Sequence, residues 1–141
     1  MTIREWFEEF AREKELPVAE LNLEPEAPNQ LCIMMNGENG VFEGHGVFLE
    51  EERLFLFYTI VGVRIPADRR ERLSSYLLSL NYKLKTAAFF IEDSTGELTV
   101  RTVQYLTGAD WEKRELLETL VLGCGKTADY FYPQLMKEIF G

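Results

Sequence analysis

The spacing of apolar residues along the chain changes from a helical pattern to a strand pattern and back again. Near the start, apolar residues fall three and four positions apart, at Ile3, Trp6, Phe7 and Phe10. This spacing predicts a helix over about residues 2–15. Thr2 and Glu5 fit a capping box at its beginning. Three prolines then follow with little apolar pattern, so residues 17–29 are expected to form an extended connector.

The middle of the chain has the short apolar runs that are typical of strands. Strands are predicted at 31–35, 41–49 and 54–65, with turn residues between the first two. The third contains LFLFYTIVGV, which shows almost no polar alternation. A strand of this kind belongs in the middle of a sheet whose two faces are both covered. One face can take the helices of the chain, and the other needs the terminal helix or a second copy of the protein.

The second half of the chain repeats the change of pattern. A helix is predicted over about residues 67–81, followed by strands at 86–92 and 97–105 with a turn between them. A last helical segment runs from about Asp110 to the C-terminus, as one kinked helix or two. The order α-β-β-β-α-β-β-α predicts an α+β fold in which helices pack on an antiparallel sheet. One domain over residues 1–141 fits this length.

The segment LVLGCGKTADYF resembles the end of a nucleotide-binding P-loop. In a P-loop the first glycine stands five positions before the second, and here that position is Leu120. The helical spacing also continues through the glycines, at Leu117, Leu120, Cys124, Ala128, Phe131, Leu135 and Ile139. A phosphate-binding loop would interrupt this spacing. The segment is therefore predicted to be helix, weakened by Gly123 and Gly125.

Composition and charge limit the classes of partner. The formal net charge is −9 and the sequence pI is about 4.7, which disfavours nucleic acid and anionic membranes. The first residues are charged and amphipathic, unlike an export signal, and no apolar run is long enough to span a membrane. Cys32 and Cys124 lack a CxxC spacing, so reduced thiols and a cytoplasmic location are expected.

Few residues point to chemistry. His45 is the one histidine in the chain, and no nucleophile or carboxylate can be assigned to it from sequence. One histidine and two distant cysteines give no zinc-site pattern. Arg101 could face a groove, although strand alternation more often places such a residue on the solvent side. We therefore expect no catalytic residue, no cofactor and no metal.

An aromatic cluster marks the C-terminal helix. It consists of Tyr130, Phe131, Tyr132, Leu135 and Met136. Consecutive residues point in different directions around a helix, so these side chains cannot all reach one core. Either the helix is heavily buried or part of it contacts a partner, and the cluster is our candidate protein-interaction surface.

The second half of the chain resembles the YbjN family of small bacterial proteins. The resemblance rests on a helix ending in Leu-Asn, an acidic turn with glycine, a strand with a central arginine, and a final helix with Asp-Tyr. The matching residues are Leu80, Asn81, Phe90, Asp93, Gly96, Arg101, Ala128, Asp129, Tyr130 and Gly141. The resemblance implies the fold of type III secretion chaperones, which are small acidic dimers, and a role as a sensory-transduction regulator.

Three functional hypotheses follow. The first is a non-enzymatic protein-interaction module of YbjN type that forms a homodimer and binds a protein partner. The second is a protein like a secretion chaperone, which holds an unfolded segment of a client on exposed apolar surface. The third is a small enzyme with a site built on carboxylates or on Arg101. Fold alone does not decide among them.

Overall fold

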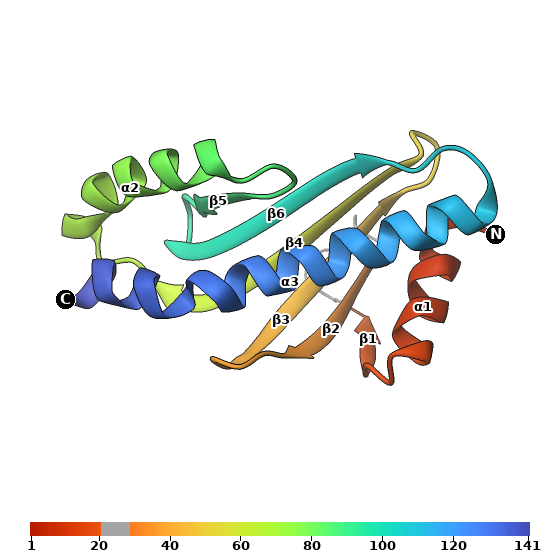
Figure 1. Cartoon of the computed structure of the whole chain (residues 1–141), viewed down its shortest axis with the longest axis horizontal. Coiled ribbons are helices and arrows are strands. Elements are labelled where there is room, and N and C mark those ends of the chain that lie inside the picture. The colour runs from red at the N-terminus through yellow and green to blue at the C-terminus, as the bar shows by residue number, and fades with distance from the viewer. Residues whose placement is uncertain (21–28) are drawn as a thin grey trace.

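A six-stranded antiparallel sheet forms the centre of the protein (Figure 1). The computed structural model describes residues 1–20 and 29–141, and within these the strand order is β1-β2-β3-β4-β6-β5. The strands are β1 (Val18–Glu20), β2 (Gln30–Asn36), β3 (Val41–Leu49), β4 (Leu54–Arg64), β5 (Ala88–Ile91) and β6 (Glu97–Tyr105). The described helices are α1 (Ile3–Glu13), α2 (Arg70–Lys83) and α3 (Asp110–Phe140), and a short 3₁₀ turn, Ala67–Arg69, precedes α2.

The predicted α+β class and most predicted elements are confirmed. Helix α1 begins with the expected capping box: Glu5 donates its backbone N–H to the Thr2 hydroxyl at 3.1 Å, and its carboxylate accepts from the Thr2 amide at 3.0 Å. Strand β4 lies in the interior of the sheet, between β3 and β6. Strand β6 has the predicted bounds, and the C-terminal segment is one helix.

The patternless connector predicted for residues 17–29 is wrong at its start. Residues Val18–Glu20 form β1, which pairs with β2 and adds an edge strand to the sheet. A strand of three residues is too short to show alternation, and backbone hydrogen bonds to the free edge of β2 do not depend on side-chain pattern. The rest of the expected connector, residues 21–28, lies outside the described residues.

The helices cover one face of the sheet. Helix α3 crosses the front of the strands, and α1 packs beside it (Figure 1). The Phe7 ring of α1 lies 5.2 Å from Phe48 and 6.1 Å from both Phe55 and Phe57, measured between ring centroids. Helix α2 packs along the edge strand β5, and its buried leucines, Leu73, Leu77 and Leu80, join the same core. The second face of β4, which the sequence predicts to be covered, has no helix on it among the described elements.

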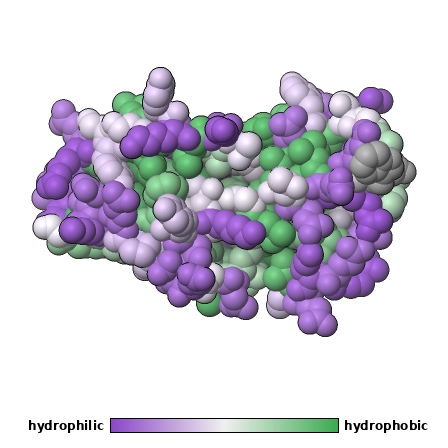
Figure 2. Space-filling view, viewed as in Figure 1, coloured by the Kyte–Doolittle hydropathy of each residue, from purple (hydrophilic) through white to green (hydrophobic). Residues whose placement is uncertain are grey.

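Hydrophilic side chains gather at the two ends of this helical side, with apolar side chains visible between them (Figure 2). Helix α3 supplies much of the core through Leu117, Leu120, Val121, Cys124, Ala128, Leu135 and Ile139. The Cys124 thiol lies 3.2 Å from the Thr59 hydroxyl, in the middle of β4. The segment Gly123-Cys124-Gly125-Lys126-Thr127 is therefore continuous helix against the sheet, as predicted. Although α3 has 31 residues, neither it nor another described helix is apolar enough to cross a membrane.

A proline in α3 is compensated by the β2–β3 turn. Pro133 has no N–H, so the carbonyl of Asp129 loses its helical partner. The Asn39 side chain donates to that carbonyl at 2.9 Å. In return, the Asp129 carboxylate accepts the backbone N–H groups of Glu38 and Asn39 at 3.0 and 2.8 Å. The turn is thus attached to α3 at the point where the proline breaks its hydrogen-bond ladder.

The two glycines of α3 have different surroundings. A Cβ atom built on Gly125 would lie 3.0 Å from the Met35 sulfur, so this glycine allows a close approach of α3 to β2. A Cβ atom on Gly123 would meet nothing within 4 Å. Packing therefore gives a reason for Gly125 but none for Gly123.

These surroundings predict opposite effects of alanine at the two positions. Gly123→Ala should raise the free energy of unfolding by about 0.5–1 kcal/mol, because it removes the conformational cost of a helical glycine without steric conflict. Gly125→Ala should raise the free energy of unfolding by less, or lower it, because the Met35 side chain must move to make room for the new methyl group. Urea denaturation of both variants measures the difference. Equal stabilisation by the two substitutions would contradict the contact between Gly125 and Met35.

Candidate functional site

The sheet has a second face that carries no helix among the described elements. We call it the open face. Cross-strand partners place Cys32, His45, Tyr58 and Arg101 in one row across β2, β3, β4 and β6. Side chains on a strand alternate between the two faces, so every second residue shares the side of this row. The open face is formed by Cys32, Met34, Val41, Glu43, His45, Val47, Leu49, Leu54, Leu56, Tyr58, Ile60, Ala88, Phe90, Thr99, Arg101, Val103 and Tyr105, with Gln30, Asn36 and Glu97 at the ends of their strands.

The open face is apolar and accessible. Its residues are exposed or half-buried except Thr99, which is buried, whereas their neighbours in sequence on β3 and β4 are buried beneath the helices. Several large side chains are well exposed, including Val103 at 41%, Met34 at 42% and Tyr105 at 62%. Within the face the charged residues are Glu43 and Arg101, with Glu97 at the end of β6, in a chain that is 28% charged. A contiguous apolar surface of this kind is typical of an interaction site.

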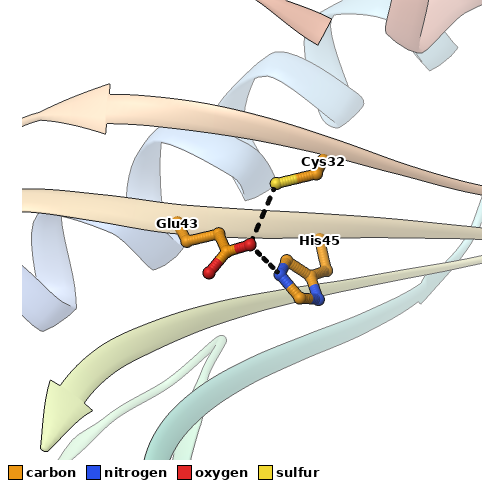
Figure 3. A group of neighbouring side chains, drawn as sticks. All are labelled: Cys32, Glu43 and His45. Atoms are coloured by element: carbon orange, nitrogen blue, oxygen red, sulfur yellow. Dashed lines mark hydrogen bonds and ion pairs between the residues drawn. The ribbon is translucent and has the colours of Figure 1, made fainter. Parts of the chain in front are cut away.

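Three side chains with metal-binding atoms meet on the open face (Figure 3). Cys32 comes from β2, and Glu43 and His45 come from β3. The Cys32 thiol donates to Glu43 Oε1 at 3.4 Å, and His45 Nε2 lies 3.1 Å from the same oxygen. In Figure 3 the three side chains stand in front of the strands, with α3 behind them. Within the described parts of the chain, this is the one cluster of three such residues that could hold an ion.

Burial and the carboxylate of Glu43 together set the electrostatics of the cluster. The Nε2 atom of His45 is buried, yet it makes no aligned hydrogen bond to a described residue despite its short distance to Glu43. Burial, followed by the hydrogen bond and the negative charge of Glu43, raises the pKa of the Cys32 thiol to about 12. The free thiol is therefore protonated near neutral pH.

Sequence reasoning missed this cluster. Cys32 and His45 are cross-strand partners, and Glu43 lies two residues from His45 on the same face. Short-range motifs such as CxxC do not describe a site assembled across a hairpin. The missing signal was strand register, which puts residues 32 and 45 opposite each other once the turn at 37–40 is fixed.

Arg101 lies on the open face, exposed to solvent, as alternation predicts. Its guanidinium carbon stands 5.8 Å from the centre of the Phe90 ring, and the Tyr58 ring is 6.4 Å from Phe90. Arg101 thus rests on an aromatic surface. It lies two strands away from His45, which is the nearest residue of the Cys32–Glu43–His45 cluster.

The structure separates the residues of the predicted C-terminal surface. Leu135 is fully buried, and Phe131, Tyr132 and Met136 are partly buried against the core. The rings of Phe131 and Phe89 meet edge to face at 6.1 Å, and those of Tyr132 and Phe42 at 5.8 Å. Tyr130 alone of this set is largely exposed, at 77%. Of the two alternatives for this helix, heavy burial thus holds for most of the aromatic cluster. The role of the cluster in protein binding stays a prediction, centred on Tyr130.

Comparisons with known proteins show the fold. YbjN from E. coli, described as a proposed transcription regulator, superposes with a TM-score of 0.61 at 12% identity, over 88% of this chain and 86% of that one. A chain of the ExsC–ExsE complex gives 0.66 at 17% identity, over 94% and 92%. A chain of the HopA1–SchA chaperone–effector complex gives 0.57 at 9% identity, over 92% and 95%.

The chain has the YbjN fold. The predicted likeness to YbjN and to type III secretion chaperones is thereby confirmed at the level of fold. No family model matches the sequence. No curated protein matches it either.

Three of the residues that suggested YbjN connect elements of this fold. The Asn81 amide donates to the Phe89 carbonyl at 2.8 Å and accepts the Phe89 N–H at 2.7 Å, which fixes β5 to the end of α2. Gly96 has a positive φ of 75° in the turn between β5 and β6, a conformation that favours glycine. Asp129 anchors the β2–β3 turn. Asn81, Gly96 and Asp129 thus each act in the connection of elements, whereas Phe90 and Arg101 of the same pattern contact each other on the open face.

The geometry of the cluster predicts the reactivity of Cys32. Glu43→Gln should lower the pKa of the thiol, because it removes the negative charge that opposes the thiolate while burial stays the same. At a fixed pH below the pKa, each unit by which the pKa of the thiol falls raises the thiolate fraction roughly tenfold. The thiolate is the form that is alkylated. We expect Cys32 to react up to about tenfold faster with iodoacetamide at pH 8, in the presence of a chelator.

Mass spectrometry of the labelled peptides measures this rate. Cys124 serves as an internal reference, because it is buried and its pKa is raised to about 11 by burial. An unchanged or slower reaction of Cys32 in Glu43→Gln would contradict the role assigned to Glu43.

Proposed function

We propose that the chain is a non-enzymatic protein-binding module, one domain that forms a homodimer through the open face of its sheet. The observation that carries this proposal is the apolar, nearly uncharged open face. An isolated sheet with helices on one side leaves this apolar area in water, and association with another protein surface removes it. Both cysteines are free thiols, in keeping with a reducing cytoplasm.

A second copy of this chain matches the open face in apolar character and in charge. The central strand β4 presents Leu54, Leu56, Tyr58 and Ile60 there. The two leucines are flanked by Val47 and Leu49 on β3 and by Val103 and Tyr105 on β6. A self-complementary contact places the same patch on both partners. Glu43 and Arg101 have opposite charge, so each can face the other residue across a two-fold axis. The near absence of charge also limits the desolvation cost of association.

The net negative charge of the chain predicts how the affinity of the dimer depends on salt concentration. Two copies that each carry a net charge of −9 repel one another, and salt screens that repulsion. A homodimer should therefore tighten as the salt concentration rises. A complex with a basic partner would loosen.

The second candidate is a protein that holds a segment of a client, as a secretion chaperone does. The observation that favours it is the similarity in fold to chains from the ExsC–ExsE complex and from a chaperone–effector complex. In this alternative the open face, or the helix surface around Tyr130, contacts the client. The role of sensory-transduction regulator, which the YbjN resemblance implies, would use the same binding surfaces.

Sedimentation equilibrium of matched variants tests the proposal. Met34→Lys and Val103→Lys place a charge on exposed positions of the open face, and Tyr82→Lys places the same charge on α2 at a residue that is 92% exposed. We expect a dimer in the wild type and in Tyr82→Lys. The dissociation constant should rise at least about tenfold in each open-face variant, a loss of about 1.4 kcal/mol, because a buried lysine must be desolvated.

All samples contain a chelator, and circular dichroism verifies that each variant is folded. A wild type that is monomeric at high micromolar concentration would refute the homodimer. A dimer that survives both open-face substitutions unchanged would place the interface elsewhere. The chaperone alternative would be favoured if the wild type is a monomer that retains an unfolded client and if Met34→Lys abolishes that retention.

A further inference from the structure

We propose that Cys32, Glu43 and His45 form a site for a divalent transition metal, with Zn²⁺ as the best match. The proposal adds a ligand to the open face, and it does not depend on the homodimer, since all three side chains come from one chain. The ligands are a sulfur, a carboxylate oxygen and an imidazole nitrogen, and all three atoms lie within 4.8 Å of one another. These are the three ligand types that proteins use for zinc.

Two of the three distances between the ligand atoms fit a tetrahedral ion. Typical bonds to zinc are about 2.3 Å for sulfur and about 2.0 Å for nitrogen and oxygen, so the edges of the tetrahedron are roughly 3.3–3.6 Å. The Cys32 sulfur lies 3.4 Å from Glu43 Oε1, and His45 Nε2 lies 3.1 Å from the same atom. The third edge joins Cys32 and His45, which face each other on paired strands. These two ligand atoms lie within 4.8 Å of each other, so an ion that replaces the thiol proton requires the Cys32 and His45 side chains to bring this edge to about 3.5 Å.

The buried His45 Nε2 atom, which lies close to Glu43 but makes no aligned hydrogen bond, is the second observation that points to a ligand. A buried polar atom without a hydrogen bond costs free energy, and such atoms are uncommon in folded proteins. His45 Nε2 is one of these atoms, and it points toward Glu43 and Cys32 (Figure 3). Metal coordination would give this nitrogen a partner. It would also neutralise the carboxylate that now stands beside the thiol.

The choice of metal follows from the donors. A thiolate disfavours Mg²⁺ and Ca²⁺, which prefer oxygen ligands, and a mixed set of sulfur, nitrogen and oxygen suits zinc. Three protein ligands leave a fourth position, which faces outward from the sheet and is open to water or to an atom of a bound partner. Arg101 is the cation nearest along this row of the sheet. It is two strands from His45, or about 10 Å in backbone spacing, so its repulsion of the ion is largely screened.

Metal titration of the whole chain tests the site. We expect one Zn²⁺ per chain in competition with a chromophoric chelator. Cys32→Ser and His45→Gln should each weaken binding by at least about 100-fold, since loss of an outer-shell partner alone costs 10–100-fold. Co²⁺ should give a thiolate charge-transfer band in the near ultraviolet, absent from Cys32→Ser. Cys124→Ala, which removes the other thiol of the chain, should keep both the band and the affinity.

A second readout needs no variant at the site. Zn²⁺ should protect Cys32 of the wild-type chain from alkylation, and a chelator should restore the reaction. This measurement stays decisive even if a substitution unfolds the protein. Absence of binding, equal affinity in Cys32→Ser and Cys124→Ala, or alkylation of Cys32 at the same rate with and without Zn²⁺ would each overturn the proposal. Loss of the dimer in chelator would leave these metal results unaffected, so the two proposals fail separately.

Discussion

Packing of α1 and α3 against the same face of the sheet is the constraint on which the rest of the structure depends. The phenylalanines of β3 and β4 alternate with smaller or more polar neighbours, and the helices bury the aromatic side. Strand geometry then fixes the opposite side, because each buried residue puts the next one on the open face. The apolar open face and the Cys32–Glu43–His45 cluster are both consequences of this one-sided arrangement.

Two polar links hold the parts of the fold in register. One joins Asn39 and Asp129, and it allows Pro133 to lie inside α3 without leaving a carbonyl unpaired. The other joins Asn81 to the backbone of Phe89 and attaches β5 to α2. Each link joins two elements through a few hydrogen bonds and does not depend on the apolar core.

The sequence predicts the elements well where local pattern is strong. The capping box of α1, the interior strand β4 and the bounds of β6 all follow from spacing. Strand β1 is missed because three residues carry no period. The candidate site is missed for a different reason: Cys32 and His45 are 13 positions apart, and only the register of β2 against β3 brings them together. Likewise, the aromatic cluster around Tyr130 shows interaction potential in sequence, whereas burial depends on contacts with Phe89 and Phe42.

The central claim is that the open face is covered when the protein associates. Hydroxyl-radical footprinting at low and high protein concentration tests it most directly, because it reports exposure residue by residue. The account predicts that Met34 and Tyr105 lose reactivity as the concentration rises, while the exposed residues Tyr82 and Tyr130 keep theirs. Protection of Tyr130 or Tyr82 with unchanged reactivity of Met34 and Tyr105 would contradict it.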